Sequence, residues 1–382
     1  IFIKKYIFVA WKMRNYQNLI FTKFFLETTL SRIMEFFDTI TEIETDKYLL
    51  KPMKRIQTLT LILQISLAFI IYFNVSKPLS LIFCVIVLIL LPATYKFTEF
   101  TTFATIWDNM DYTGIVKRDL IFTTSDQKRI RGYVYYKEGI QLNIQNQQDQ
   151  ADKMKYPTII GVHGYGSHHK VMDRYCLPSL LKLGYVYFTY DACGHGINKH
   201  VSVPYDPGAY QELADFISEV KRLNFVDTSR IGIIAMSYGA SKASVVAYPD
   251  PDIKLIIFLS GIFDVLLNKE KAKIVEHIKL YLTGFRWTQD LAYYKSLSGI
   301  YLFKKEGIIL RGQSEPTPNY KRIFIFSNKD DRQAHIQNTY DAIEKLDLPQ
   351  TNYRIFPSGG HHFKGNEYYL SVEIFNVLSS FL

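Results

Sequence analysis

The chain has 382 residues, with 45 Lys and Arg against 36 Asp and Glu, so its formal net charge is +9. Apolar residues make up 48% and charged residues 21%, which excludes a disordered chain. Three cysteines are too few for a disulfide framework and indicate free thiols in a reducing compartment. The absence of a Gly-X-Y repeat or sustained heptads excludes collagen and coiled coils, and the lack of an Arg-rich stripe predicts no nucleic-acid partner.

The N-terminal extension, residues 1–55, begins with a basic stretch that precedes the first acidic residue, Glu27. Such a stretch suits a mitochondrial address or an anionic lipid surface, although it lacks the Ser richness of a good transit peptide. Residues 31–50 form an amphipathic segment with an acidic cluster. We interpret this segment as a solvated face, with a docking helix for a partner as the alternative.

Two long uncharged, mostly apolar runs follow, at residues 56–76 and 78–95. Each is about long enough to cross the roughly 30 Å hydrocarbon core of a bilayer as a helix. The connection at residues 74–78 is short and polar and contains a proline, as a turn between antiparallel helices does. We therefore predict a transmembrane hairpin over residues 56–96, with a buried hairpin in a soluble domain as the alternative.

The charges beside the two runs predict the orientation of this hairpin. Four basic residues lie just before the first run and Lys96 follows the second, whereas the turn carries only Lys77. The positive-inside rule then places both ends, and all that follows, on the cytosolic or matrix side. We expect an integral membrane protein, with the mitochondrial inner membrane as one candidate location and residues 97–112 as an interfacial linker.

From residue 113 onward, short apolar strands alternate with helical segments, which predicts an α/β fold with a mostly parallel sheet covered on both faces. No helix separates the first two strands, which predicts an antiparallel edge, and residues 139–156 predict a surface loop. We expect strands at residues 119–123, 130–136, 158–163, 185–191, 231–235, 255–259, 323–327 and 353–356, and helices that include residues 210–223, 241–247, 337–346 and 370–382.

The strongest signal for chemistry lies at residues 231–241, where an apolar strand runs into Ala-Met-Ser-Tyr-Gly and then into a helix of small residues. This pattern is typical of a nucleophile elbow, which holds its serine in a strained backbone conformation above the sheet. The turn needs small residues two before and two after the serine, and here these are Ala235 and Gly239. We therefore expect Ser237 to be a nucleophile, with the helix N-terminus stabilising negative charge that develops beside it.

Two further glycine-containing turns follow apolar strands. In the first, His-Gly-Tyr-Gly at residues 163–166, the backbone N–H of Tyr165 is expected to point towards the reacting carbonyl. The N–H of Tyr238 would then be the second oxyanion donor. An ordinary strand-to-helix turn is the alternative interpretation. The second turn is Asp-Ala-Cys-Gly-His-Gly at residues 191–196.

With these turns, residues 113–382 resemble the α/β-hydrolase superfamily, and within it the serine-aminopeptidase and monoglyceride-lipase-like group. That group has Asp-x-Arg-Gly-x-Gly after the fourth strand, and Cys193 stands here where the group has Arg. The resemblance implies an α/β-hydrolase fold and a catalytic triad in the order Ser, acid, His. Ala235 stands in place of the usual Gly but is still small.

The acid is expected after the strand-like residues 322–326, which are followed by Ser-Asn-Lys-Asp-Asp at residues 327–331. The family pattern Gly-x-x-Asp-x-x-Val-Pro aligns best on Asp331, with Asp330 as the alternative, and the other Asp would be a solvated loop residue. Ala334 and His335 stand where the family pattern has Val-Pro.

The base is expected in a stretch that resembles the family's Pro-Gly-x-x-His-x-Phe. Counting four residues from Pro357 gives His361, with His362 as the alternative. The remaining histidines, including His168 and His169, show no convincing metal-ligand spacing and are expected at the surface. No metal or organic cofactor is expected.

The resemblance implies that Ser237 attacks an acyl carbonyl and that His361 takes its proton and later gives it to the leaving group. Asp331 would hold the imidazole in the useful tautomer, and water would hydrolyse the acyl-enzyme. An aromatic-rich insertion at residues 266–321 lies where the superfamily places its cap. It is either a lid over an acyl pocket or a set of extra helices packed on the body of the domain.

These observations predict a membrane-anchored serine hydrolase that cleaves acyl ester or thioester bonds, because an anchor brings the site close to lipid esters or acylated proteins. Fold alone does not determine function. The alternative is an accessory structural subunit of a membrane complex, for example in the mitochondrial inner membrane, built on a hydrolase fold. In that case residues 1–55 would contact the neighbouring subunits.

Overall fold

A computed structural model describes residues 112–140, 142, 154–198, 201, 207–272, 277 and 290–381. All of them belong to one compact unit, Tyr48–Leu382. The predicted N-terminal extension (residues 1–55) and the predicted hairpin (residues 56–96) lie outside the described residues. Within the described ranges, every helix is too short or too polar to span a bilayer.

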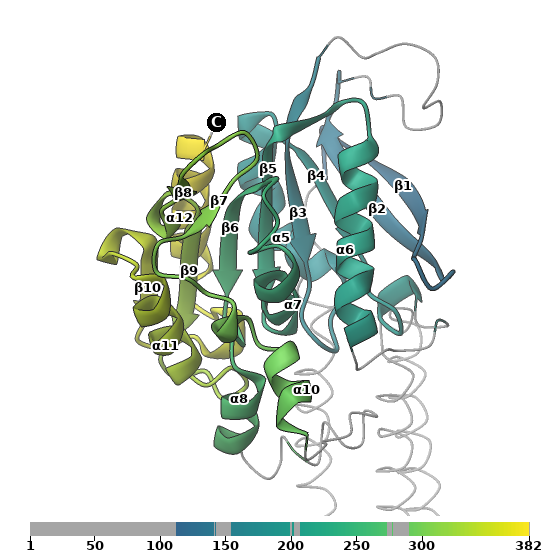
Figure 1. The fold of residues 1–382 in the computed structure, drawn as a ribbon. Helices are drawn as coiled ribbons and strands as arrows, with labels where there is room; N and C mark the ends of the chain where they lie inside the picture. The colour runs from purple at the N-terminus through teal and green to yellow at the C-terminus, as the bar shows by residue number, and fades with distance from the viewer. Residues whose placement is uncertain are drawn as a thin grey trace, which may run out of the picture. The chain divides into compact units, whose positions relative to one another are not determined.

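An eight-stranded sheet forms the centre of the domain (Figure 1). Its strands are, in order across the sheet, β1 (Ile115–Thr123), β2 (Arg129–Lys137), β4 (Val186–Tyr190), β3 (Tyr156–Val162), β5 (Val226–Met236), β6 (Ile253–Leu259), β9 (Ile323–Asn328) and β10 (Tyr353–Phe356). Strand β2 is antiparallel to both β1 and β4, and all the other pairs are parallel. The predicted parallel sheet with an antiparallel edge is therefore confirmed.

The pattern of apolar and polar residues in each strand matches how far the strand is buried. Strand β6 is buried at six of its seven positions and reads as an almost continuous apolar run, as a strand covered on both faces must. Edge strand β1 instead alternates buried and exposed residues in its second half and carries charged side chains, which protect a sheet edge from pairing with other chains.

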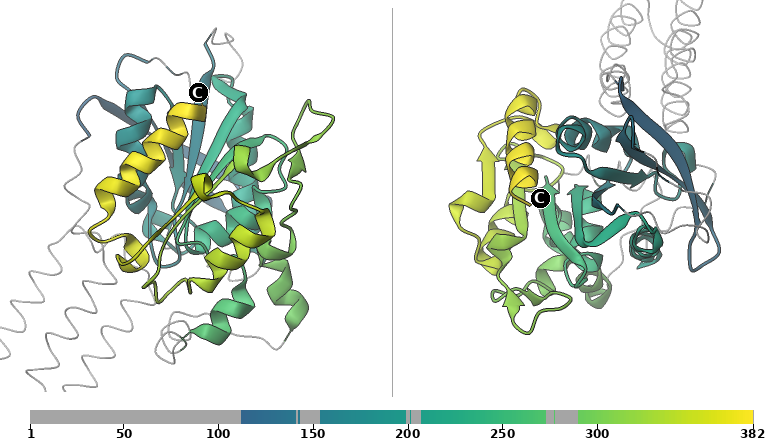
Figure 2. Two further views of the ribbon diagram at one scale, coloured as in Figure 1. Left: turned by 90° about the vertical axis from the view of Figure 1, so that its left-hand side faces the viewer. Right: turned by 90° about the horizontal axis from the view of Figure 1, so that it is seen from above.

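Helices cover both faces of the sheet, as Figure 2 shows from above. Helices α5 (His169–Leu183) and α12 (Glu367–Phe381) pack on one face, where their buried residues form one core cluster with those of β3, β5 and β6. Helices α6 (Pro207–Arg222), α7 (Tyr238–Val246) and α11 (Gln337–Leu346) cover the other face. Helix α5 was not among the predicted helices, whereas the other four were.

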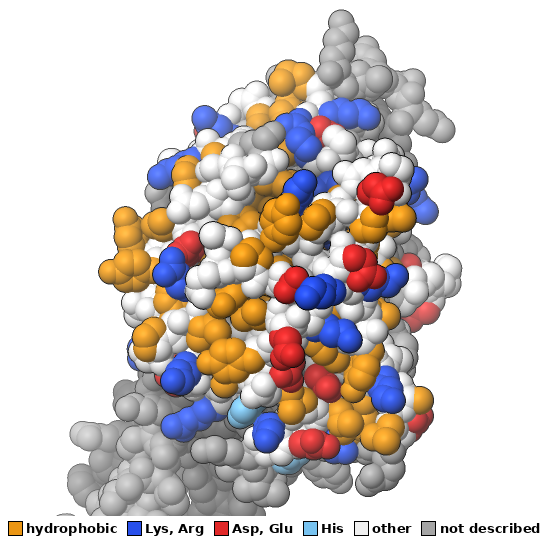
Figure 3. Space-filling model, turned by 60° about the vertical axis from the view of Figure 1, so that its left-hand side comes forward, with side chains coloured by type: hydrophobic (Ala, Val, Ile, Leu, Met, Phe, Trp, Pro, Cys, Tyr) orange, Lys and Arg blue, Asp and Glu red, His pale blue; other side chains and the backbone are white. Residues whose placement is uncertain are grey.

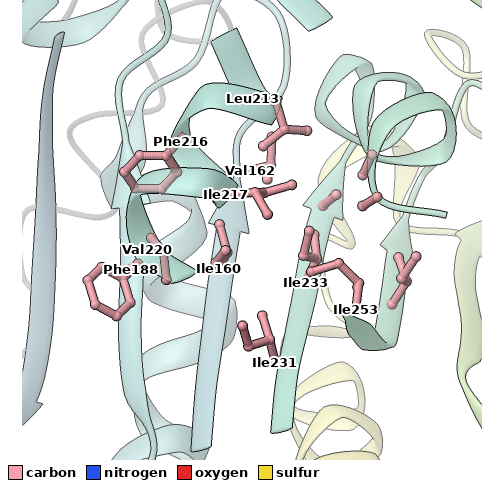
Figure 4. Packing of buried hydrophobic residues seen from close by; sticks show 14 of the residues in the cluster. Ile160, Val162, Phe188, Leu213, Phe216, Ile217, Val220, Ile231, Ile233 and Ile253 are labelled. Atoms are coloured by element: carbon pink, nitrogen blue, oxygen red, sulfur yellow. The ribbon is translucent and has the colours of Figure 1, made fainter. Parts of the chain in front are cut away.

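Helix α6 shows how the second face is sealed (Figure 4). Its residues Leu213, Phe216, Ile217 and Val220 follow the spacing of one helical face, and all four are at most 2% exposed. They pack in one cluster with the isoleucines of β3 and β5, including Ile233. Burying each such side chain contributes roughly 1.5–3 kcal/mol.

The region expected to be a cap contains two short helices, α8 (Val265–Lys271) and α10 (Leu291–Ser296). Each begins at an aspartate, Asp264 or Asp290, whose carboxylate accepts backbone N–H groups of the first turn. A hairpin of β7 (Ile308–Ile309) and β8 (Pro316–Thr317) follows. Part of the aromatic set predicted for the lid, Phe285 and Trp287, lies outside the described residues.

Figure 3 shows the face of the domain that carries β10 and α11, with basic and acidic side chains interspersed. No field of a single charge sign dominates this face. The mixed pattern agrees with the modest net charge of the sequence.

Candidate active site

Ser237 lies between β5 and α7 at the carboxyl edge of the sheet. Its backbone angles are φ 56° and ψ −120°, a strained conformation for a residue with a side chain. Its N–H donates to Leu259 O at the end of β6 (2.9 Å), and its carbonyl accepts from Ser241 N (3.1 Å). The turn therefore has the geometry of a nucleophile elbow.

The small residues around Ser237 are required by close backbone contacts. A Cβ on Gly239 would lie 2.4 Å from Val162 O and 2.6 Å from His163 O, at the end of β3. Ala235 is fully buried beside the turn, so the Ala that replaces the usual Gly is accommodated. Substitution of Gly239 by any larger residue would push α7, and with it Ser237, away from β3.

Asp331 and His361 come together on the loops after β9 and β10. His361 Nδ1 lies 2.8 Å from Asp331 Oδ2, and the two residues are 7% and 6% exposed. The other carboxylate oxygen, Oδ1, accepts the N–H groups of Gln333 (2.8 Å) and Ala334 (3.0 Å). Because a carboxylate only accepts, Nδ1 carries the proton and Nε2 presents a lone pair.

The two alternative residues occupy different positions. Asp330 is exposed, and its carboxylate accepts the N–H groups of Gly359 (3.3 Å) and Gly360 (2.8 Å), so it holds the loop that carries His361. His362 is half-buried, and its carbonyl accepts from the Tyr175 hydroxyl (3.1 Å). Asp331 and His361 are thus the acid and the histidine that this structure joins by a hydrogen bond.

The two residues expected to donate to the oxyanion lie beside Ser237. A Cβ on Gly164 would be 3.0 Å from Ser237 Cβ and 3.5 Å from Ser237 Oγ, so the turn after β3 runs directly past the serine. The rings of Tyr165 and Tyr238 meet edge to face at 6.1 Å. The backbone segments that carry these two tyrosines therefore lie beside the same serine.

His163 fixes the orientation of the turn, a role that the sequence pattern alone did not reveal. Its Nε2 accepts from Ala192 N (2.9 Å), so its Nδ1 must carry the proton that is donated to Gly164 O (2.8 Å). Burial holds the pKa of His163 well below its usual value, which keeps the ring neutral. Because the peptide is trans and planar, the N–H of Tyr165 points away from His163.

His168 and His169 correct the expectation of surface histidines. They are 5% and 0% exposed. His169 donates from Nδ1 (2.8 Å) and from its backbone N–H (2.6 Å) to Asp191 Oδ1, while Lys117 Nζ lies 3.0 Å from its Nε2. The partners come from β1 and the end of β4, distant in sequence, which explains why sequence spacing gave no sign of this burial.

The cap packs on the helix that follows the nucleophile. Leu297 O, just after α10, accepts from the hydroxyls of Ser241 (3.1 Å) and Tyr210 (3.0 Å). Tyr238 and Tyr293 pack against the same apolar cluster. Aromatic side chains from the body and the cap therefore surround the residue next to Ser237. Across the described ranges, no group of three or more His, Cys, Asp or Glu is placed to hold a metal ion.

Comparison with protein families assigns the chain to a known group. The model of the prolyl oligopeptidase family matches residues 176–378, just over half of the chain, and this range includes Ser237, Asp331 and His361. The chain belongs to the prolyl oligopeptidase family, whose members are serine hydrolases with the α/β-hydrolase fold. A comparison with curated protein sequences gives no match.

Solved structures show the same fold at low sequence identity. An acylaminoacyl peptidase from Pyrococcus horikoshii is 17% identical (TM-score 0.50), and the match covers 72% of this chain and 43% of that one. A 2,6-dihydroxy-pseudo-oxynicotine hydrolase is 14% identical (TM-score 0.50; 69% and 68% covered). Oligopeptidase B from Trypanosoma brucei is 14% identical (TM-score 0.50; 72% and 38%). The chain spans less than half of the length of either peptidase.

Proposed function

We propose that this protein is a membrane-anchored serine hydrolase that cleaves acyl ester or thioester bonds through an acyl-enzyme at Ser237. The observation that carries the proposal is the 2.8 Å hydrogen bond between His361 and Asp331 at the sheet edge where Ser237 occupies its strained turn. A buried acid that orients a histidine, at the edge that also presents a serine on an elbow, is the arrangement that activates a hydroxyl for acyl transfer.

Each residue then has a defined task. One carboxylate oxygen of Asp331 accepts two backbone N–H groups, which hold the side chain in place. The other oxygen accepts from Nδ1 of His361 and so keeps the proton of the ring on that nitrogen. Nε2 of His361 takes the proton of Ser237 as Oγ attacks the acyl carbon, and returns it to the leaving alkoxide or thiolate. The N–H groups of Tyr165 and Tyr238 donate to the oxygen of the tetrahedral intermediate, and water repeats the sequence on the acyl-enzyme.

An ester or thioester substrate is favoured over a peptide by two features. Aromatic side chains from the cap and the body pack beside the residue next to Ser237, which suits an apolar acyl chain. The apolar runs at residues 56–76 and 78–95 also suit an anchor that keeps the domain near lipid. The serine-aminopeptidase and monoglyceride-lipase-like group is the subgroup that we propose. The alternative of a structural subunit depends on residues 1–55, which lie outside the described residues.

Labelling with a fluorophosphonate probe tests the nucleophile. The detergent-extracted full-length protein should be labelled, the Ser237→Ala variant should not, and Ser241→Ala, which removes a hydroxyl four residues on in the same helix, should be labelled as the wild type is. Hydrolysis of a short p-nitrophenyl ester should fall about 10⁵-fold or more in Ser237→Ala. Equal labelling of wild type and Ser237→Ala would contradict the proposal.

Substrate class and anchoring are tested separately. Matched acyl esters, thioesters and amides of one chain length should be cleaved in the order ester or thioester first, amide slowest. A preference for the amide would replace our substrate class with that of a peptidase. The full-length protein should stay with membranes after extraction at alkaline pH, and its release into the supernatant would contradict the anchor.

A further inference from the structure

Helix α7, which begins directly after Ser237, carries a buried lysine in its second turn. Lys242 is only 2% exposed, and its neighbours along the helix are mostly small residues. Lysine is almost never fully buried without a paired charge, because removing an ammonium group from water costs several kcal/mol. Its position, five residues after Ser237, therefore needs an explanation.

The ammonium group lies against aromatic rings. Lys242 Nζ is 5.6 Å from the ring centroid of Tyr238 and 5.5 Å from that of Tyr190, both within the range of a cation–π interaction. Its hydrogen bond to the Tyr190 hydroxyl is long, at 3.4 Å, and is the only one that Nζ makes within the described ranges. The charge is thus directed mainly at two rings, one of which belongs to the residue next to the nucleophile.

The opposite charge nearby is Glu212 on α6, which is 3% exposed. Its Oε2 accepts from Cys193 N (3.0 Å), and its Oε1 has no hydrogen-bond partner in the described part of the chain. Burial lowers the pKa of Lys242 below its usual value, and the Glu212 carboxylate opposes this shift without cancelling it. Glu212 therefore favours the charged form of Lys242 without direct contact, since no ion pair joins the two among the described residues.

The ring of Tyr238 is held from three sides. The rings of Tyr165 and Tyr210 each meet it edge to face at 6.1 Å, and Lys242 lies at 5.6 Å. A ring fixed in this way also fixes the backbone of residue 238, whose N–H is one of the two proposed oxyanion donors. A buried positive charge against the ring of residue 238 also lowers the energy of negative charge that develops at the nearby N–H.

We propose, building on the proposed serine hydrolase function, that Lys242 is a positioning residue for the oxyanion site, which it supports through Tyr238. The ammonium holds the Tyr238 ring and supplies positive potential close to that residue. The competing explanation is that Lys242 only balances the buried charge of Glu212.

A second buried cation of the domain shows what a structural role looks like. Arg322 is fully buried and donates to Tyr248 O (3.0 Å), just after α7, and to Ile253 O (2.7 Å), at the start of β6, so two backbone carbonyls accept from its charged group. Lys242 has no such short contacts in the described part of the chain. Its charge is left available to act on the site beside it.

The experiment compares three variants with the wild type in hydrolysis of one p-nitrophenyl ester. Lys242→Met removes the charge and keeps the length of the side chain. Lys242→Met/Glu212→Gln removes both charges and keeps an acceptor for Cys193 N. Lys221→Met is the matched control, because Lys221 is ion-paired at the far end of α6, with Asp250 and Asp252. Urea unfolding checks that each variant is folded.

We expect Lys242→Met to lower kcat about tenfold with KM changed less than about twofold, because the charge acts on the transition state more than on the bound substrate. The double variant should stay equally slow, and Lys221→Met should keep kcat within about twofold of the wild type. Wild-type kcat in the folded Lys242→Met variant, or its recovery in the double variant, would overturn the proposal and leave Lys242 as a partner of Glu212 alone.

Folding failures also have a defined meaning. If Lys242→Met does not fold, the double variant decides, because it contains no uncompensated buried carboxylate. A double variant that does not fold would assign Lys242 a structural role and overturn the proposal. Failure of the serine hydrolase function itself would look different, since the wild type would then resist the fluorophosphonate probe and show no ester hydrolysis that depends on Ser237.

Discussion

Two pairs of aspartate and histidine among the described residues share the same hydrogen bond but differ in their surroundings. His361 Nδ1 lies 2.8 Å from Asp331, and His169 Nδ1 lies 2.8 Å from Asp191. His361 is 7% exposed, and Nδ1 is the only one of its ring nitrogens with a hydrogen bond within the described residues. His169 is fully buried, and Lys117 Nζ occupies the position beside its Nε2 at 3.0 Å.

The difference shows that an acid beside a histidine does not by itself make a catalytic base. A base needs a second nitrogen that can reach a substrate or a nucleophile, and in His169 that nitrogen is taken. Asp191 also accepts the N–H of His169 (2.6 Å) and that of Ile197 (2.9 Å). The pair of Asp191 and His169 therefore ties β1, β4 and α5 together, whereas the pair of Asp331 and His361 leaves one nitrogen available for chemistry.

The largest expected effect separates the two histidines. His361→Ala should lower kcat for ester hydrolysis about 10⁵-fold, since it removes the base, and should change the free energy of unfolding much less. His169→Ala should do the reverse, because it removes one hydrogen bond from the buried carboxylate of Asp191 and so lowers the free energy of unfolding by about 1–3 kcal/mol. Steady-state kinetics and urea unfolding of both variants measure this. Similar effects of both variants on kcat would remove the distinction.

The carboxylates give the next largest effect. In Asp331→Asn, the amide oxygen should keep the N–H groups of Gln333 and Ala334, so the NH₂ group faces His361 and forces its proton onto Nε2. This tautomer cannot accept a proton from Ser237, and kcat should fall about 10⁴-fold in a folded protein.

Asp191→Asn is the matched control for this change. Both oxygens of Asp191 accept N–H groups, so the NH₂ group of an asparagine must face one of these donors. We expect a loss of unfolding free energy of about 3 kcal/mol, with kcat of the folded fraction within about tenfold of the wild type. A folded Asp331→Asn variant with full activity would show that another residue, with Asp330 as the first candidate, orients the base.

The sequence predicted most of the sheet and the arrangement at its carboxyl edge. Buried parallel strands are continuous apolar runs, and the turns that carry Ser237 and His361 have restricted residue types, so both can be recognised locally. The hairpin of β7 and β8 was not predicted, because strands of two residues show no periodicity. The acid was harder to place, since Asp330 and Asp331 are adjacent and only their contacts distinguish them.

The buried polar residues were beyond local patterns. His169 meets Lys117, 52 residues away, and Asp191, 22 residues away, so no short window contains the set. Sequence analysis therefore placed His169 at the surface. Lys242 did have a local signal, because a lysine is unusual within a helix of small residues after a nucleophile elbow. The buried carboxylate of Glu212, on another helix, became apparent only from the fold.

The smallest expected effect concerns a histidine without a carboxylate partner. His195 is 3% exposed and donates from Nδ1 to Cys193 O (2.8 Å), and burial lowers its pKa to about 4. The unfolded chain, with a histidine pKa of about 6.5, binds the proton more readily. As the pH falls from about 6.5 to about 4, the unfolded chain takes up a proton that the folded ring does not. The free energy of unfolding therefore decreases over this range and is highest, as far as His195 is concerned, at pH 7 and above.

Urea unfolding of the wild type and of His195→Asn at pH 7.5 and 4.5 measures this contribution, since asparagine can still donate to Cys193 O without titrating. The wild type should lose about 2–3 kcal/mol more than the variant over this range, at about 1.4 kcal/mol per pH unit below 6.5. His163, whose pKa is also held low by burial, is present in both proteins and cancels in the difference. Equal losses would mean that His195 takes up its proton in the folded state as readily as in the unfolded chain. A buried histidine that donates to a carbonyl would then tolerate a positive charge without a carboxylate beside it. In that case the carboxylates of Asp191 and Asp331 would not explain how His169 and His361 differ from His195.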